Sequence, residues 1–248
     1  MNDGHQGNGV DASAFSEEKG MGGDRKAFGL PADACLLLFV GDLRTPRKNL
    51  ATVLQALLRL PDNVQLAVAG FLPGSPYPEE AKALGIAHRV HFLGLVRNMP
   101  TLMHSVDAFV FPSRYEAMSL SLLEALAAGL PVITASTAGG AEIIGTDCGI
   151  VLEDPDDAAA LASAIARLAD APALRREMGE AARRLAGEFG WARMARRYLD
   201  LYRGFANQAG EASTSSGTQP AAVTSDTTAL TRGAVYPLMA SAVDEAGA

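Results

Sequence analysis

The sequence predicts an α/β fold built on a doubly wound parallel sheet, and three observations lead to this prediction. Short apolar runs of strand length alternate along the chain with segments of helical periodicity, as expected for buried parallel strands with covering helices. Most of these runs are closed by Gly or Pro. The 248 residues, of which 48% are hydrophobic and 20% charged, are enough to bury a core in one domain of medium size. The six predicted strands are residues 35–40, 64–69, 90–93, 107–111, 131–134 and 149–152.

Helices are predicted between and after these strands. The first follows strand 35–40, where apolar residues recur at helical spacing and Pro61 ends the pattern. Two amphipathic helices follow Pro155, and a third runs from Trp191 to Phe205. Residues 207–248 are small and polar with few large apolar side chains, so this segment is predicted to form a disordered tail.

Composition argues against several classes of partner. The chain has 21 basic and 28 acidic residues and an isoelectric point near 5.1, so it offers no basic field for nucleic acid or an anionic membrane. Its two cysteines suit a reducing compartment and show no metal spacing. The start of the sequence lacks a signal-peptide pattern, and no apolar run reaches membrane length. We therefore expect a cytoplasmic protein with no nucleic-acid partner, no transmembrane segment, no cofactor and no metal.

The stretch "RYEAMSLSLLEALAAGLPV" contains two glutamates, Glu116 and Glu124, at one edge of the predicted sheet. Ligands of such sheets bind at the carboxyl ends of the strands, where helix N-termini present unpaired amides. On one helix the two carboxylates would be separated by about 12 Å along the axis. Both can reach one ligand only if Glu116 lies in a loop and Glu124 near the start of the next helix. Amides at that helix start would bind phosphate and the carboxylates would bind hydroxyls, which describes a nucleotide sugar.

The longer segment "FPSRYEAMSLSLLEALAAGLPVITASTAGGAEII" resembles the signature of family-four retaining glycosyltransferases with the GT-B fold. The similarity covers most of residues 35–205. It implies a Rossmann-like donor-binding domain over residues 31–190, the C-terminal half of a GT-B fold, followed by a crossover helix over 191–206. The motif "NGVD" near the start resembles the connection between the two domains of that family, so residues 1–30 are expected to be a remnant of the linker. The resemblance further implies that the acceptor domain is supplied upstream or by a separate chain.

The resemblance also implies roles for individual residues. Glu116 would accept hydrogen bonds from the donor sugar, Glu124 from the nucleotide ribose, and Lys48 would face the diphosphate and stabilise the charge of the leaving group. Each has a simpler alternative. Glu124 could complete a capping box with Ser121, Glu116 could be a solvated loop carboxylate, and Lys48 could lie at a solvated helix start.

Two departures from the family pattern concern phosphate binding. After Gly41, which is itself expected to bind the donor, this chain has Asp42 where the family usually has an arginine. Arg44 or Arg47 would have to supply the missing guanidinium. Residues 117–119 are Ala-Met-Ser where many members have Gly-Phe-Gly, so the backbone has less freedom to approach phosphate closely. The backbone amides around the helix start are still expected to bind phosphate. The glycines of "TAGGAEII" are expected to bring further amides near the donor. The residues expected to bind in these two segments are Met118, Ser119, Leu120, Gly139 and Gly140.

The function expected from this resemblance is transfer of a sugar from a nucleotide diphosphate sugar to a hydroxyl group with retention at the anomeric carbon. Two alternatives stay open: a module that binds nucleotide sugars without turnover, and a degenerate fragment or interaction scaffold. A dinucleotide dehydrogenase is excluded, because the loop after the first predicted strand lacks Gly-x-Gly-x-x-Gly.

Overall fold

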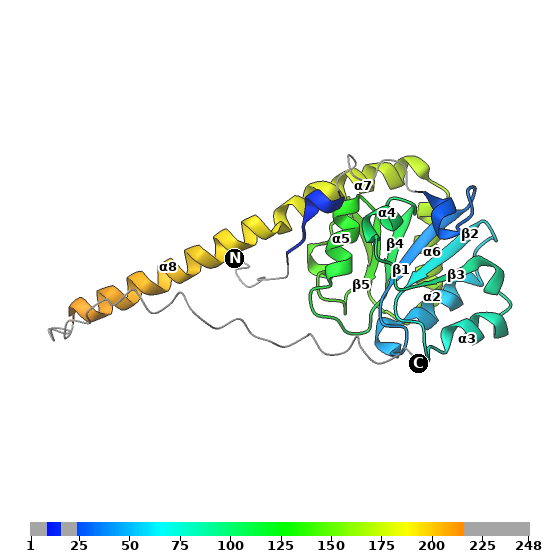
Figure 1. Cartoon of the computed structure of the whole chain (residues 1–248), viewed down its shortest axis with the longest axis horizontal. Helices are drawn as coiled ribbons and strands as arrows, with labels where there is room; N and C mark the ends of the chain where they lie inside the picture. The colour runs from blue at the N-terminus through cyan, green and yellow to red at the C-terminus, as the bar shows by residue number, and fades with distance from the viewer. Residues whose placement is uncertain (1–8, 16–23, 216–248) are drawn as a thin grey trace, which may run out of the picture. The chain divides into compact units, whose positions relative to one another are not determined.

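The computed structural model describes residues 9–15 and 24–215 and contains a six-stranded parallel sheet flanked by helices (Figure 1). The strand order is β3-β2-β1-β4-β5-β6, and every neighbouring pair is parallel. All six predicted strands are confirmed, with ends that differ by one residue at most. The strands are β1 (Cys35–Val40), β2 (Val64–Ala69), β3 (Val90–Gly94), β4 (Ala108–Phe111), β5 (Val132–Ala135) and β6 (Gly149–Leu152).

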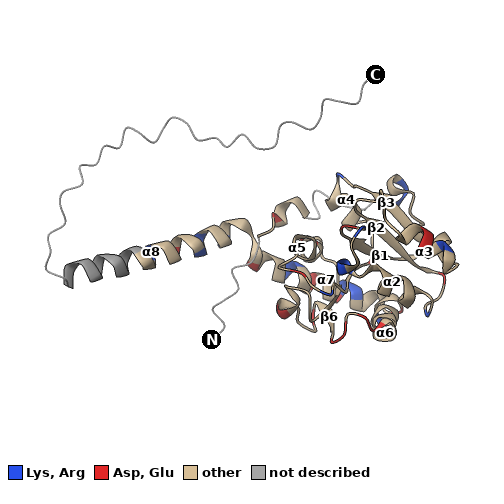
Figure 2. Cartoon of the chain, turned by 90° about the horizontal axis from the view of Figure 1, so that it is seen from below, with Lys and Arg blue, Asp and Glu red and all other residues tan. Residues whose placement is uncertain are grey.

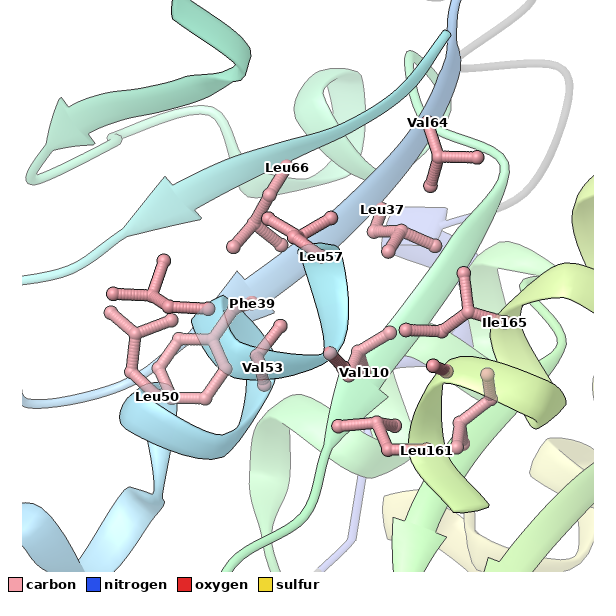
Figure 3. Close-up of a cluster of buried hydrophobic side chains, with 14 of the residues drawn as sticks. Leu37, Phe39, Leu50, Val53, Leu57, Val64, Leu66, Val110, Leu161 and Ile165 are labelled. Atoms are coloured by element: carbon pink, nitrogen blue, oxygen red, sulfur yellow. The ribbon is translucent and has the colours of Figure 1, made fainter. Parts of the chain in front are cut away.

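Helices cover both faces of the sheet, as the near-continuous apolar strands require. Residues of α2 (Leu50–Leu57), α3 (Tyr77–Ala83) and α6 (Ala158–Ala169) share one buried cluster with Leu37 and Phe39 of β1. Figure 3 shows side chains of this cluster pointing toward one another from β1, β2, β4, α2 and α6.

A second cluster lies on the opposite face. Leu36 and Leu38 of β1 pack there with residues of α4 (Met99–Met103), α5 (Leu120–Ala128) and α7 (Pro172–Ala186). Alternate residues of β1 thus belong to different clusters, because successive side chains of a strand point to opposite faces. Short 3-10 helices complete the described elements: η1 (Ala12–Phe15), η2 (Arg25–Phe28), η3 (Pro46–Lys48), η4 (Ala87–Arg89), η5 (Ala141–Ile143) and η6 (Gly187–Phe189).

The segment before β1 is part of this core. Val10 and Phe15 are buried in the second cluster, and the amide of Val10 donates to the carbonyl of Phe189 at 3.0 Å. Leu30 is buried in the same cluster. The described residues of the expected linker remnant therefore pack on the domain.

The last helix is longer than predicted. Helix α8 runs from Trp191 to Ser215 instead of ending at Phe205, so the prediction of a disordered tail is wrong for residues 207–215. No Pro interrupts the chain between Trp191 and Ser215, so nothing in the sequence forces the helix to end at Phe205. Residues 216–248 lie outside the described residues. The chain divides into two compact units, Met1–Asp200 and Leu201–Ala248, and the sheet lies in the first. None of the helices in the described ranges combines the length and apolar character needed to span a membrane.

The strand order reverses between β1 and β4. β2 and β3 follow on one side of β1, whereas β4, β5 and β6 follow on the other. Chains that leave adjacent strands at such a point diverge to opposite faces and leave a crevice at the carboxyl ends, where ligands of this fold class bind. The segments that leave β1 and β4 are residues 41–49 and 112–119, and these two loops contain most of the predicted site residues.

Candidate functional site

Lys48 lies at this edge of the sheet with its side chain largely covered. It ends η3, its side chain is only 14% exposed, and its ammonium group lies 4.8 Å from the ring centre of Phe111 at the end of β4. Gly41 makes room for the lysine stem, because a Cβ there would lie 3.1 Å from Lys48 Cγ. The alternative of a solvated helix start does not describe this lysine.

Glu116 is the direct partner of Lys48. Its carboxylate accepts a hydrogen bond from Lys48 Nζ and is as little exposed as the lysine side chain. Arg47 Nη1 lies 3.9 Å from the other oxygen of the same carboxylate, and its side chain is 45% exposed. Glu116 is therefore not a solvated loop carboxylate. One negative charge and two positive charges from two loops meet at the switch point of the sheet.

Asp42, which stands where the family usually has an arginine, forms an ion pair with Arg44 in the same loop. Arg44 donates to both oxygens of Asp42, from Nε at 2.9 Å and Nη2 at 2.8 Å, and its guanidinium stacks 4.6 Å from the ring centre of Phe71. Hydrogen bonds from Arg44 lower the pKa of Asp42 to about 2, so the carboxyl is ionised at neutral pH. Its charge is balanced by Arg44, which is thereby engaged within its own loop. In the free chain the cations next to Glu116 come from Arg47 and Lys48, and not from Arg44.

Helix α5 begins directly after the loop of Glu116. Ser119 occupies the N-cap position with extended backbone, but no side chain caps the first turn of the helix. The Ser119 hydroxyl pairs instead with that of Ser121 at 2.9 Å. The Ser119 side chain therefore does not cap the helix, because its hydroxyl and that of Ser121 bond each other.

Glu124 is the fifth residue of α5 and lies one helical turn further from the loop. Ser121 does not form a capping box with Glu124, because the N-cap of α5 is Ser119 and no side chain caps the first turn. Burial raises the pKa of the Glu124 carboxyl. A half-buried carboxylate whose charge is disfavoured by its surroundings is a common property of binding sites.

The glycine loop before η5 contacts the Glu116 loop through its backbone. The amide of Gly139 donates to the carbonyl of Glu116 at 2.8 Å, and Glu116 forms an isolated parallel bridge with Ala138. A Cβ on Gly139 would lie 2.6 Å from that same carbonyl oxygen, so only glycine fits. The amide of Gly140 donates to Glu142 Oε2 at 2.8 Å. Both amides are engaged within the protein here, and their contact with a donor stays a prediction.

The other residues predicted from this loop differ in exposure. Met118 is partly buried against the second cluster, and a Cβ on Gly140 would lie 3.0 Å from its sulfur. Ser119 is buried, whereas Leu120 is 47% exposed. The backbone of these three residues leads into the uncapped start of α5.

Sequence reasoning missed three residues that surround the site. Asn49 is fully buried, adopts the left-handed conformation with φ of 65°, and donates to the carbonyl of Pro155 at 2.7 Å. Arg114 and Asp156 form an ion pair at 2.7 Å between the loops that follow β4 and β6. The available signal was Asn49 itself, because asparagine between a lysine and an apolar helix is one of the few side chains that tolerate positive φ.

A second carboxylate between two cations lies at the start of β4, away from this site: Asp107 pairs with Arg25 Nη2 at 2.9 Å and lies 3.9 Å from Arg175 Nη2. Basic and acidic residues are interspersed along the ribbon in Figure 2. Among the described residues, no group of three or more His, Cys, Asp or Glu could hold a metal ion. The absence of a metal from the reaction stays a prediction.

Comparison with known proteins identifies the family. The profile of the family described as glycosyl transferases group 1 matches residues 23–185, about two thirds of the chain. The chain belongs to this family. The match spans all six strands and every loop of the site described above, so the glycosyltransferase resemblance seen in the motifs is confirmed.

Relatives of this chain within the family include two named bacterial enzymes. A D-inositol 3-phosphate glycosyltransferase 2 of Catenulispora acidiphila is 33% identical over 192 residues, which is 72% of this chain and 45% of that protein. The lipopolysaccharide glucosyltransferase WaaG of Escherichia coli K12 is 31% identical over 181 residues, covering 71% and 45% of the two proteins. The chain thus spans about half the length of the curated relatives it matches.

Solved structures of similar fold agree with the family. Sucrose-phosphate synthase from Thermosynechococcus elongatus superimposes with a TM-score of 0.71 and 27% identity over 81% of this chain and 52% of that one. HepE from Anabaena, solved in complex with UDP, gives a TM-score of 0.70 at 20% identity, covering 79% and 56%, which shows the shared fold. The Rossmann-like half of a GT-B fold predicted from the motifs is therefore confirmed.

Proposed function

We propose that this chain is the donor-binding part of a retaining glycosyltransferase, which binds a nucleoside diphosphate sugar in the crevice between the β1 and β4 loops. The observation that carries the proposal is the meeting of Lys48 and Glu116 at the switch point of the sheet, next to the uncapped start of α5. Cations and free amides suit a diphosphate, and carboxylates suit sugar hydroxyls.

The chemistry follows from these groups. Lys48 binds the diphosphate and stabilises the negative charge that develops as the bond from the sugar to phosphate breaks. The start of α5 adds its positive dipole end and its amides. Glu116 orients the sugar by accepting hydrogen bonds from its hydroxyls, and Glu124 accepts from the ribose. The incoming hydroxyl of an acceptor attacks from the face that the diphosphate leaves, which gives retention, and its proton passes to an oxygen of the departing diphosphate.

A titration of the purified chain tests the binding step. UDP is the first probe, because HepE of the same fold was solved with UDP, and GDP, ADP and their glucose or mannose conjugates follow. We expect saturable binding of one nucleotide by calorimetry. Glu124→Ala should weaken that binding by roughly 10–100-fold, the effect of losing hydrogen bonds to a charged group.

The matched control is Glu79→Ala on α3, whose side chain is 77% exposed and pairs with Lys82 away from the site. It should bind as the wild type does. If no nucleotide binds, or if both glutamate variants bind like the wild type, the assigned donor site is wrong.

A second candidate, binding without turnover, is favoured by the Asp42–Arg44 pair. The guanidinium of Arg44, one of the two expected to replace the family arginine, is paired with Asp42 in its own loop. Less positive charge is then left to stabilise a departing diphosphate. Measuring release of UDP from UDP-glucose, with and without sugar alcohols as acceptors, separates the two candidates. Binding accompanied by UDP release supports the transferase, whereas binding alone supports the second candidate.

A further inference from the structure

Three loops at the carboxyl edge of the sheet meet at Asp156, which the motifs did not single out as functional. It lies after β6 and just before α6. Its Oδ1 accepts hydrogen bonds from Arg114 Nε at 2.8 Å and from Asn49 Nδ2 at 3.1 Å, and Arg114 Nη2 lies 2.7 Å from the same oxygen. Arg114 comes two residues before Glu116, and Asn49 comes directly after Lys48. One carboxylate oxygen therefore connects the two loops that carry the central ion pair.

Further bonds strengthen each connection. Arg114 Nη1 donates to the carbonyl of Pro46 at 2.8 Å, and the Arg114 amide donates to the carbonyl of Arg47 at 3.0 Å. The amide group of Asn49 also donates to the carbonyl of Pro155 at 2.7 Å, and its oxygen accepts from Thr52 at 2.8 Å. Because Asn49 is fully buried and has positive φ, its side chain fixes the direction in which the chain enters α2.

We infer that Asp156 is a positioning residue that holds the Lys48 loop and the Glu116 loop at a fixed separation. This inference rests on the proposed function of the crevice. In the free chain Lys48 and Glu116 also join the two loops directly, but a bound diphosphate competes for Lys48 and sugar hydroxyls compete for Glu116. The bonds at Asp156 do not involve either group, so they persist when a ligand separates the pair.

A positioning role can be told from a structural one, because loss of a positioning residue weakens ligand binding more than it lowers the melting temperature. The side chains of Asp156 and Arg114 are 53% and 39% exposed, and exposed pairs contribute little to stability. Loss of Asp156 should move the melting temperature by less than about 3 °C. Displacement of the site loops should weaken ligand binding by about tenfold, because small errors of position are costly in a preorganised site.

The experiment compares Asp156→Ala with Asp157→Ala in the full chain. Asp157 is the matched control, since it lies in the same loop but caps α6 by accepting from the amides of Ala159 and Ala160 at 2.9 and 2.8 Å. Hydrogen exchange of residues 41–49 and 112–119 is measured without ligand, and UDP is titrated by calorimetry. Asp156→Ala should speed exchange in both loops and weaken UDP binding with a small change in melting temperature. Asp157→Ala should lower the melting temperature and leave loop exchange and UDP affinity unchanged.

Asp156→Asn provides a rescue, because it retains an oxygen at the same place. Its loop exchange should lie between those of the wild type and Asp156→Ala. Wild-type exchange rates in both loops of Asp156→Ala would overturn the inference. The exchange measurement needs no ligand, so it decides the role of Asp156 even if the wild type binds no UDP, a result that would count against the proposed function alone.

Discussion

Glu124, which we propose binds the ribose, illustrates at the scale of a single residue how burial of a carboxyl costs stability. Burial raises the pKa of its carboxyl, so ionisation of Glu124 at neutral pH is less favourable in the folded chain than in the unfolded one. Glu116 differs in its contacts, because Lys48 donates a hydrogen bond to its carboxylate and Arg47 lies nearby. A ribose hydroxyl donating to Glu124 would supply the bond that its surroundings do not.

Glu124→Gln should therefore stabilise the free protein at pH 7, by about 0.5–1 kcal/mol, while it weakens nucleotide binding. The sign follows from linkage: burial raises the folded pKa above that of the unfolded chain, so the wild type regains stability as the pH falls through the folded pKa. The advantage of the glutamine variant should shrink over that range and vanish below the unfolded pKa. Urea unfolding at several pH values measures it, and an advantage that does not depend on pH would contradict the explanation.

The roles of individual residues were only partly predictable from the sequence. The motif placed Glu116 in a loop and Glu124 near a helix start, and the structure has them there. The pairing of Arg44 with Asp42 was not predictable, because an arginine two residues from a carboxylate can equally extend into the crevice. Asp156 was missed for a related reason: in the sequence, "EDPDD" describes a turn and a helix cap, and its contact with Arg114 joins residues 42 positions apart.

At the scale of elements, the site depends on close contact between two loops. The segment after β5 lies against the segment after β4 through the bridge of Glu116 and Ala138, and Gly139 is the point of closest approach. The sequence showed two glycines but not which of them the backbone contact required. Strand positions were predictable because apolar runs and Gly or Pro boundaries are local features. Contacts between loops are not local.

Gly139→Ala should push the Glu116 loop away, because the new Cβ would lie 2.6 Å from both the Glu116 carbonyl oxygen and the Ala117 carbonyl carbon. We expect a loss of about 1–3 kcal/mol in the free energy of unfolding and weaker UDP binding. Gly187→Ala is the control, since its φ is −58° and a Cβ there would meet no atom within 4 Å. That variant should be neutral or slightly stabilising. Thermal unfolding and UDP titration of both proteins test this, and equal behaviour of the two would show that the loop contact is dispensable.

At the scale of the whole molecule, the two buried clusters are joined by the sheet that separates them. Adjacent residues of β1 belong to different clusters, with Leu37 in one and Leu38 in the other. The alternation predicts that neither cluster can form without the central strands. The sequence anticipated this sheet from its six apolar runs, but it did not reveal that residues before β1 join one of the clusters.

Leu37→Ala and Leu38→Ala should each destabilise the domain by about 2–5 kcal/mol, because both side chains are fully buried. Each variant should still unfold in a single transition at a lower temperature. Calorimetry and circular dichroism should give the same midpoint for a given variant. Two separate transitions in either variant would mean that the two faces of the sheet unfold independently.

The packing of Val10 and Phe15 bears on how this domain can be cut from its sequence. The family profile begins at residue 23, yet both of these buried side chains lie before it, and Val10 is tied to the carbonyl of Phe189. A fragment chosen from the profile alone would uncover the face of α5 that Phe15 covers and would present an apolar surface to water. A soluble expression fragment should therefore start at or before Gly9, fourteen residues ahead of the boundary that sequence similarity suggests.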